Sequence, residues 1–237
     1  AHDPAPNAAD GSFDDERVGG SGMRRADVKE PMRILALGAH PDDIEVGCGG
    51  TMIKYAENGH RIFLMVMTQG GAGGNVSVRK KEQERSAKLL QAEEVFWGGY
   101  QDTEVPLGRD LIQTVEGIVR KIEPHFIFVH YHDDTHQDHR HLAMSTITAT
   151  RYTKNVLFYE GPTTQNFAPT VFVDIQQALD RKIQALEAHA SQVRKTNIEG
   201  ISIADLVRSS AHFRGIQGRV RTAEGFLPLR LFINIGI

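Results

Sequence analysis

Cysteine is almost absent from this chain of 237 residues, because Cys48 is its single thiol and an internal disulfide is therefore impossible. Such a composition favours a reducing compartment, and we expect a cytoplasmic protein. The sequence has no unbroken apolar run near the length that spans a bilayer, so we expect no membrane span. The net charge of −3 gives no electrostatic reason to bind nucleic acid or an acidic membrane.

The first 31 residues contain few aliphatic side chains and are rich in alanine, proline, glycine and aspartate. Such a segment cannot bury enough apolar surface to offset its ordering entropy, so we predict a disordered tail at 1–31. It also lacks the apolar centre of a signal peptide. Met23 is a natural start, so part of the tail is expected to come from an expression vector; a partner-binding arm is the alternative. Residues 32–237 are predicted to form a single domain.

From Met32 onward, short buried strands alternate with helices. This alternation is typical of a mostly parallel sheet with helices on both faces, so we predict an α/β, Rossmann-like fold of three layers. In the helix at 79–92, Ala87, Leu89 and Leu90 are expected to face inward. Residues 198–237 show a mixed pattern. The predicted strands are 32–39, 61–68, 94–100, 125–131, 156–161 and 170–175, and the predicted helices are a segment ending at Gly59, 79–92, 111–123, 142–152 and about 176–190.

Two loops rich in histidine and aspartate follow two of these strands. The first is AHPDD at 39–43, after the first predicted strand, and the second is HYHDDTHQDHRH at 130–141, after the fourth. Because ligands bind beyond the carboxyl ends of parallel strands, we expect the two loops to meet at one edge of the sheet. A third loop, GGAGGN at 70–75, is expected to be flexible.

The first loop has the composition of a zinc site. Zinc in hydrolases usually takes three ligands from His, Asp and Glu and keeps an open position for water. His40 and Asp43 lie three residues apart, and Pro41 restricts the backbone between them, so both side chains can point to one position. Asp42 would then lie close to the bound water and accept its proton. Taken alone, the same loop also fits a helix-capping turn.

The second loop supplies the candidate third ligand. His136 and His139 are three residues apart, so one can bind the metal while the other acts as a proton donor. Asp138, between them, can fix the tautomer and orientation of an imidazole. The remaining histidines of the loop are expected to be structural or exposed to solvent, because one zinc ion takes few ligands. They are His130, His132 and His141.

Three motifs together resemble the PIG-L/LmbE-like deacetylase family: AHPDDIEVGCGGT at 39–51, HDDTHQDHRH at 132–141 and ALEAHASQ at 185–192. The resemblance extends from about Met32 to Phe226 and implies an LmbE-like fold. Members of this family are zinc-dependent hydrolases that remove an acetyl group from N-acetylated amino sugars. The resemblance therefore implies one zinc ion per chain and a small amino-sugar substrate, and it favours a homo-oligomer, either a trimer or a hexamer.

The resemblance also implies roles for individual residues. The zinc ligands would be His40, Asp43 and His139. The catalytic residues would be the general base Asp42, the general acid or polarising group His136, and the orienting residue Asp138. The substrate-binding residues would be Arg79, Tyr100, Asp102 and His189.

Some of these positions also fit simpler interpretations. Arg79 is equally typical of a surface arginine near a helix N-terminus, and His189 of a hydrogen-bonded core histidine. Cys48 is expected to be a small packed residue and not a ligand. The chain departs from the family at Gly71, where a glutamate often follows the second strand, and this departure leaves the substrate open.

Two other functions remain open beside sugar deacetylation. One is a zinc amidohydrolase of the same fold that acts on a non-sugar acyl amide, and the other is a non-catalytic metal-binding protein. A nucleotide-dependent oxidoreductase lacks support, because GAHPDD stands where the G-x-G-x-x-G turn would be and no G-x-x-x-x-G-K-[ST] motif occurs. Iron, cobalt or manganese would also suit a His/Asp/His site with water.

Overall fold

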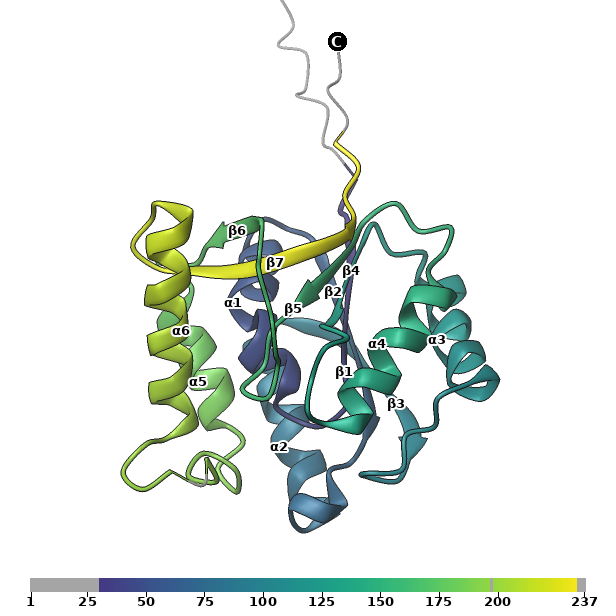
Figure 1. Ribbon diagram of the computed structural model, residues 1–237, viewed down its shortest axis with the longest axis horizontal. Coiled ribbons are helices and arrows are strands. Elements are labelled where there is room, and N and C mark those ends of the chain that lie inside the picture. The colour runs from purple at the N-terminus through teal and green to yellow at the C-terminus, as the bar shows by residue number, and fades with distance from the viewer. Residues whose placement is uncertain (1–29, 197, 234–237) are drawn as a thin grey trace, which may run out of the picture. The chain divides into compact units, whose positions relative to one another are not determined.

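The computed structural model describes residues 30–196 and 198–233, so the predicted tail lies outside the described residues except for Glu30 and Pro31. The described chain contains a seven-stranded sheet in the order β3-β2-β1-β4-β5-β7-β6 (Figure 1). Helices lie on both faces of this sheet, which confirms the predicted three-layer α/β fold. The strands are β1 (Arg33–Gly38), β2 (Arg61–Thr68), β3 (Ala92–Tyr100), β4 (Phe126–His130), β5 (Val156–Tyr159), β6 (Val171–Asp174) and β7 (Ala223–Arg230).

The sheet is parallel from β3 through β5 and ends in antiparallel pairs. β1 lies between β2 and β4, and both pairings are parallel, whereas β7 is antiparallel to β5 and to β6. Along β1, Ile34 and Ala36 enter the core on one face, and Leu35 and Leu37 enter the core on the other. A strand buried on both faces has to be apolar, which explains the unbroken apolar run from Ile34 to Gly38.

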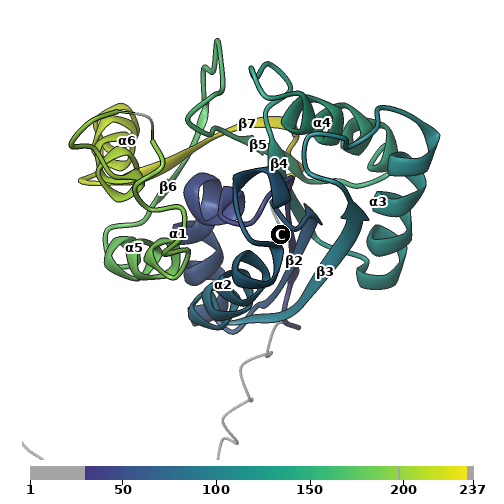
Figure 2. The same ribbon diagram turned by 90° about the horizontal axis from the view of Figure 1, so that it is seen from below.

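The helices divide between the two faces of the sheet. Helices α1, α2, α5 and α6 cover one face, and α3 and α4 cover the other (Figures 1 and 2). Within residues 30–196 and 198–233, no helix is both long enough and apolar enough to cross a membrane. The helices are α1 (Asp43–Glu57), α2 (Val76–Leu89), α3 (Arg109–Ile122), α4 (Gln137–Ala149), α5 (Leu179–Glu187) and α6 (Ile203–Gly218).

Two helices, α2 and α4, begin earlier than the sequence pattern predicts, because polar residues cap them. The side chain of Asn75 accepts a hydrogen bond from the backbone N–H of Val78, so α2 begins at Val76 and not at 79. His136 caps α4 in the same way, so this helix begins within the histidine-rich loop and not at 142. The start of α4 carries His139 and therefore fixes the direction in which its side chain points.

The expected inward face of α2 was partly wrong. Ala87 and Leu90 are buried, but the side chain of Leu89 is 40% exposed. The helix α6 and the strand β7 lie in the region where the sequence pattern was mixed. In the glycine-rich loop after β2, a short 3-10 turn, η1 (Gly71–Gly73), precedes α2.

Close packing against β5 shapes the first half of α1. Gly47 lies against the ring of Tyr159, and a Cβ atom added to Gly47 would lie 2.1 Å from the Cδ2 atom of that ring. The hydroxyl of Tyr159 donates a hydrogen bond of 2.7 Å to the carbonyl of Leu37 in β1. Cys48 is buried in this core, in keeping with a packing role.

Candidate metal and catalytic site

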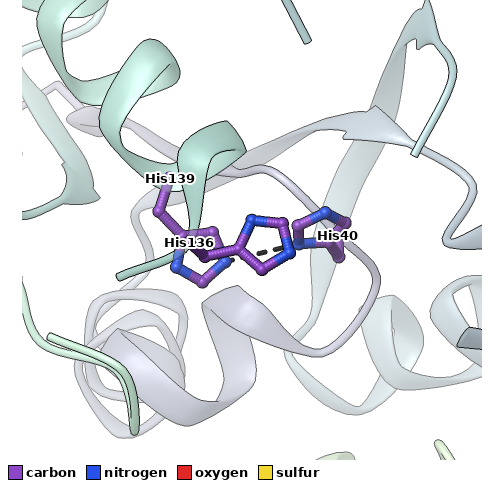
Figure 3. Close-up of side chains that lie close together, drawn as sticks. All are labelled: His40, His136 and His139. Atoms are coloured by element: carbon purple, nitrogen blue, oxygen red, sulfur yellow. Dashed lines mark hydrogen bonds between the residues drawn. The ribbon is translucent and has the colours of Figure 1, made fainter. Parts of the chain in front are cut away.

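The two polar loops meet at the carboxyl edge of the sheet, as predicted from the sequence. The first loop follows β1 and the second follows β4, and these two strands are parallel neighbours. The rings of His40, His136 and His139 therefore converge (Figure 3), with ring centres of His40 and His136 at 4.6 Å and of His40 and His139 at 5.3 Å.

Potential ligand atoms of His40, Asp43 and His139 lie close together. The Nδ1 atom of His40 lies 3.3 Å from the Nε2 atom of His139. The carboxylate of Asp43 closes the triangle, with Oδ2 at 3.3 Å from His40 Nδ1 and Oδ1 at 3.5 Å from His139 Nε2. Potential ligand atoms also group in other ways within the described chain. These groups are His40, His136 and His139; His40, Asp102, His136 and Asp138; and Asp43, His130 and His139.

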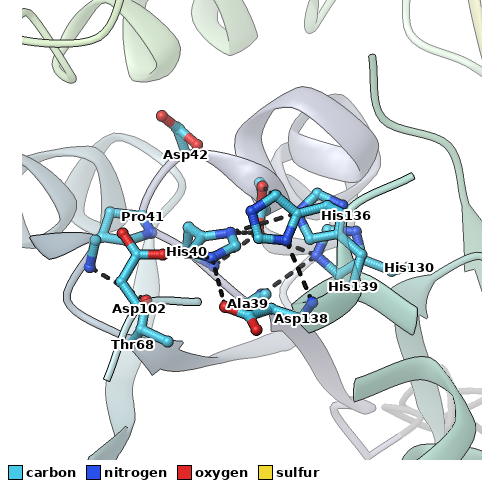
Figure 4. A network of polar contacts seen from close by, with 12 residues as sticks. Ala39, His40, Pro41, Asp42, Thr68, Asp102, His130, His136, Asp138 and His139 are labelled. Atoms are coloured by element: carbon cyan, nitrogen blue, oxygen red, sulfur yellow. Dashed lines mark hydrogen bonds and ion pairs between the residues drawn. The ribbon is translucent and has the colours of Figure 1, made fainter. Parts of the chain in front are cut away.

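Two carboxylates hold the outer nitrogen of His40 (Figure 4). The Nε2 atom lies 3.0 Å from Oδ1 of Asp102 and 3.1 Å from Oδ2 of Asp138. Asp102 is fixed in turn by the backbone N–H of Ala72, and Asp138 by that of Thr103. Burial alone would lower the pKa of His40, but its contacts with Asp102, Asp138 and Asp43 raise this pKa to about 12 in the absence of a metal.

Asp138 contacts the imidazole of His40, and its role in orienting that ring stays a prediction. A proton on Nε2, donated to the two carboxylates, leaves the lone pair of Nδ1 facing the other ligand atoms. Asp102 also lines the cavity described below, so it contacts both His40 and that cavity.

Asp134 performs the corresponding role for His139, and sequence reasoning missed it. Its Oδ2 atom lies 3.3 Å from His139 Nδ1 and accepts a hydrogen bond from Thr164, while its Oδ1 atom accepts one from the backbone N–H of His136. Burial lowers the pKa of His139, but Asp43 and Asp134 together raise it to about 9. The sequence feature that could have indicated this partner of His139 is the pair of adjacent aspartates, Asp133 and Asp134, in the HDDTH segment.

His130 is part of the site and is not exposed to solvent. It is buried, its Nε2 atom lies 3.0 Å from Asp43 Oδ2, and its ring stacks on that of His139 at 3.9 Å. Burial and the neighbouring His139 lower the pKa of His130 to about 4, so its imidazole is neutral at pH 7. The expectation that His130 is exposed was therefore wrong, while a structural role stays a prediction, because His130 also belongs to a group of potential metal ligands with Asp43 and His139. His132 is exposed, and His141 bonds to the carbonyl of Val105.

Asp42 lies at the rim of this cluster in an unusual backbone conformation. Its φ of 97° is positive, which costs free energy for a residue other than glycine and is often found at functional sites. Its Oδ2 atom lies 3.3 Å from Nη2 of Arg79. Burial and the charge of Asp43 raise the pKa of Asp42 to about 6, although His189 and Arg79 oppose the shift. A carboxylate with this pKa is ionised at neutral pH and can still accept a proton.

Arg79 is buried, so its interpretation as a surface arginine was wrong. Its guanidinium joins two loops, since Nη1 donates to the carbonyl of Gly70 and Nη2 donates to that of Pro41, both at 2.8 Å. Arg79 therefore holds the first loop beside the glycine-rich loop and places a positive charge near Asp42.

His136 caps α4 and also faces the cluster. Its Nδ1 atom accepts a hydrogen bond from the backbone N–H of Asp138, so in the neutral ring the proton is on Nε2. Burial and the neighbouring charges of His40 and His139 lower the pKa of His136, which favours this neutral form. His136 can therefore donate a hydrogen bond from Nε2 without first binding an extra proton.

A cavity of about 490 Å³ opens above these residues. Asp42, Arg79, Asp102, His136 and His189 all line it. His189 is fully buried, with Nε2 at 3.4 Å from Oε1 of Glu45, so it combines a core position with access to the cavity. The rest of the wall mixes apolar and polar groups, including Val46, Gly73, Pro162, Gln192 and Lys195.

Tyr100 occupies a different place from the other predicted substrate-binding residues. Its hydroxyl donates to Asp110 at 2.6 Å and lies 2.9 Å from the hydroxyl of Thr114. It lines a smaller neighbouring depression that also includes Asp102. Contact between Tyr100 and a substrate therefore stays a prediction.

The fold and the site together define a metal-dependent hydrolase of the deacetylase type. The sequence profile of the PIG-L family, described as GlcNAc-PI de-N-acetylase, matches residues 35–150. The chain is 34% identical over 167 residues to an uncharacterised deacetylase, YaiS, of Escherichia coli K12, which covers 67% of this chain and 90% of that protein. The chain belongs to the PIG-L family of deacetylases.

Two further relatives cover most of the chain. The diacetylchitobiose deacetylase of Thermococcus kodakarensis is 27% identical over 239 residues, covering 88% of this chain and 86% of that protein. The crystal structure of N,N'-diacetylchitobiose deacetylase from Pyrococcus horikoshii, in complex with an inhibitor, superposes with a TM-score of 0.75. It is 26% identical in sequence, and the match covers 85% of each chain.

Proposed function

We propose that this protein removes the acetyl group from an N-acetylated amino sugar, giving acetate and the free amine. The observation that carries the proposal is the triangle of His40, Asp43 and His139 with the carboxylate of Asp42 beside it, all facing one cavity. Relatives named as deacetylases of diacetylchitobiose and of an N-acetylglucosaminyl malate support the same class of substrate.

We further propose that His40, Asp43 and His139 hold one zinc ion. Ligand atoms about 2.0–2.1 Å from zinc in a tetrahedral arrangement lie about 3.3 Å from one another. The two histidine nitrogens are 3.3 Å apart, and one oxygen of Asp43 lies 3.3 Å from His40 Nδ1 while the other lies 3.5 Å from His139 Nε2. These spacings support an ion shared by the three side chains. Asp102 and Asp138 hold the outer nitrogen of His40, and Asp134 faces that of His139 at 3.3 Å, as carboxylates commonly do behind zinc-binding histidines.

Asp42 acts as the base in this proposal. The chemistry that zinc supplies when bound is Lewis-acid activation of an amide carbonyl and of a water molecule. Asp42 accepts a proton from the attacking water, whose oxygen bonds to the carbonyl carbon of the acetyl group. The same carboxyl then returns the proton to the nitrogen as the C–N bond breaks, so that acetate and the amine leave.

His136 stabilises the charge that develops during this step. Its Nε2–H donates a hydrogen bond to the carbonyl oxygen of the acetyl group, and this bond strengthens as the oxygen becomes negative. The backbone N–H of Asp138 holds the ring in place through Nδ1. His136 is a second candidate for protonation of the amine.

The polar wall of the cavity suits the hydroxyl groups of a sugar. Asp102, His189 and Gln192 present hydrogen-bonding groups there, and Arg79 binds substrate in addition to its contacts with the loops. We expect Tyr100 to contribute from the neighbouring depression.

The proposal also includes a location and an oligomeric state. The single cysteine favours a reducing, cytoplasmic location. The family resemblance favours a homo-oligomer, either a trimer or a hexamer.

Acetate release from a panel of substrates tests this function. The panel contains N-acetylglucosamine, N,N'-diacetylchitobiose and, as non-sugar amides, N-acetylated amino acids. We expect release from at least one amino sugar and none above background from the amino acids. The reverse order would identify an amidohydrolase for non-sugar amides. Bound zinc without release from either group would favour a non-catalytic site.

A further inference from the structure

The helix α2 turns a polar face toward the protein interior. Arg79, Glu82, Gln83 and Ser86 follow the i, i+3, i+4, i+7 spacing that usually carries apolar core residues, and each is at most 4% exposed. Polar groups are costly to bury unless they form hydrogen bonds. The partners of these four side chains therefore indicate what this face contributes to the protein.

Two of the four side chains reach the first loop. Arg79 donates to the carbonyl of Pro41 at 2.8 Å, and the Oε1 atom of Gln83 accepts the backbone N–H of Asp42 at 3.3 Å. Arg79 and Gln83 are four residues apart and so lie on the same face of α2. The other two bind elsewhere, because Glu82 accepts hydrogen bonds from Ser191 and Ser86 donates to Glu45.

The position of Gln83 requires a side chain that both donates and accepts. Its Nε2 atom donates to Oε1 of Glu45 at 2.7 Å, while its Oε1 atom accepts from the N–H of Asp42. An ionised carboxylate only accepts and a backbone N–H only donates, so these partners fix the orientation of the amide. Leucine could form neither bond, and glutamate would face the carboxylate of Glu45.

Asp42 has a particular need for such support. Its φ of 97° is unfavourable for a residue with a Cβ atom, and such conformations persist where surrounding contacts hold them. The N–H that Gln83 binds is the backbone N–H of Asp42 itself, in the peptide that joins Pro41 to Asp42. If that peptide relaxed, the carboxylate of Asp42 would move relative to the triangle of His40, Asp43 and His139.

We propose that Gln83 is a positioning residue, which holds the backbone of Asp42 so that its carboxylate points at the reacting water. This inference rests on the proposed function of Asp42 as the base. Gln83 touches no reacting atom in this account, and it acts through Asp42. The chain of contacts runs from Glu45 to Gln83 and from Gln83 to the N–H of Asp42.

Kinetics of Gln83→Leu in the zinc-loaded protein provide the first test. A misplacement of about 1 Å can cost about 100-fold in rate, so we expect kcat to fall about 10- to 100-fold. We expect KM and zinc content to change less than twofold, as a rough bound, because the three ligands keep their own contacts. Ser86→Ala is the matched control, since it also removes a hydrogen bond to Oε1 of Glu45, and among the hydrogen bonds of the described residues the Ser86 side chain makes none to Pro41 or Asp42.

A double-mutant cycle separates positioning from a general structural effect. In the Asp42→Asn background there is no carboxylate to position, so adding Gln83→Leu should not lower the residual rate further. An equal loss in both backgrounds, or wild-type kcat in Gln83→Leu, would overturn the proposal. If Gln83→Leu does not fold, Gln83→Met removes the same two hydrogen bonds with an unbranched side chain and takes its place in the cycle.

Hydrogen exchange at the Asp42 amide tests the same contact without any reaction. We expect this amide to exchange about tenfold faster or more in Gln83→Leu and at the wild-type rate in Ser86→Ala, because a lost hydrogen bond lowers protection. An unchanged rate would overturn the proposal. If the wild-type protein released no acetate, the proposed function would fail, while the exchange rates would still decide the role of Gln83.

Discussion

The Nδ1 atom of His40 and the Nε2 atom of His139 lie 3.3 Å apart, although 99 positions separate the two residues in the sequence. Carboxylates on the far sides of both rings cause this arrangement, because Asp102 and Asp138 hold the outer nitrogen of His40 and Asp134 faces that of His139. Both rings therefore turn their remaining nitrogen toward one point. This is the geometry on which the proposed metal site depends.

Asp42→Asn is predicted to abolish most turnover while leaving the metal in place. The asparagine side chain cannot accept the proton of the attacking water, so kcat should fall about 10²- to 10⁴-fold. The substitution removes one negative charge but leaves the three proposed ligands unchanged. Acetate release and metal content, measured on the same sample, check the prediction. Full activity in this variant would show that another group is the base.

Asp134→Asn is predicted to weaken metal binding although Asp134 is not one of the proposed ligands. Residues that orient metal-binding histidines typically contribute about 10- to 100-fold to affinity, and Asp134 faces Nδ1 of His139. Asp133→Asn is the matched control, because Asp133 binds the side chain of Asn166 instead. Competition against a chelator of known affinity measures both variants. Equal affinities would contradict the role assigned to Asp134.

The rate is predicted to fall in acid because Asp42 must be ionised to accept a proton. Its pKa is raised to about 6 without a metal, and a bound cation would lower that value. The carboxylate is therefore charged above about pH 6, and kcat/KM should fall about tenfold per pH unit below its pKa.

The fall of kcat/KM in acid is measured by a pH–rate profile in which the metal content is checked at each pH. We expect the midpoint of this fall at or below pH 6, and we expect the fall to be absent from the residual activity of Asp42→Asn. A midpoint well above pH 7 would be inconsistent with Asp42 as the titrating base.

Gly47→Ala and Gly117→Ala are predicted to change stability in opposite directions. The new methyl group at Gly47 would collide with the buried ring of Tyr159, so the free energy of unfolding should fall by about 1–3 kcal/mol. At Gly117, an added Cβ would meet no described atom within 4 Å, and alanine in the middle of α3 should add about 0.5–1 kcal/mol. Urea unfolding measures both values, and a Gly47→Ala variant as stable as wild type would refute the close packing.

Much of the fold follows directly from the sequence pattern. The strands β1, β2 and β4 consist mainly of apolar residues because both of their faces are buried, and such runs are easily recognised. The two polar loops begin where β1 and β4 end, so their meeting at one edge of the sheet was predictable. The convergence of His40 and His139 follows from this topology.

Other elements were hidden because their local sequence conflicts with their structure. The strand β7 contains Gly225 and Pro228, which weaken the signal of a strand, and it pairs with β5 and β6, which lie far away in the sequence. The polar face of α2 resembles a face exposed to solvent, so sequence patterning gave no indication that Gln83 is buried. Asp134 was missed because its neighbour Asp133 is chemically identical and contacts alone distinguish them.

Metal content and acetate release, measured together before and after chelation, test the central claim most directly. We predict about one zinc ion per chain in the active protein, loss of acetate release from N,N'-diacetylchitobiose when the metal is removed, and recovery when zinc is added back. His139→Ala should lose both the metal and the activity, whereas His132→Ala, at an exposed position, should keep both. Acetate release that persists after complete removal of the metal would contradict the account.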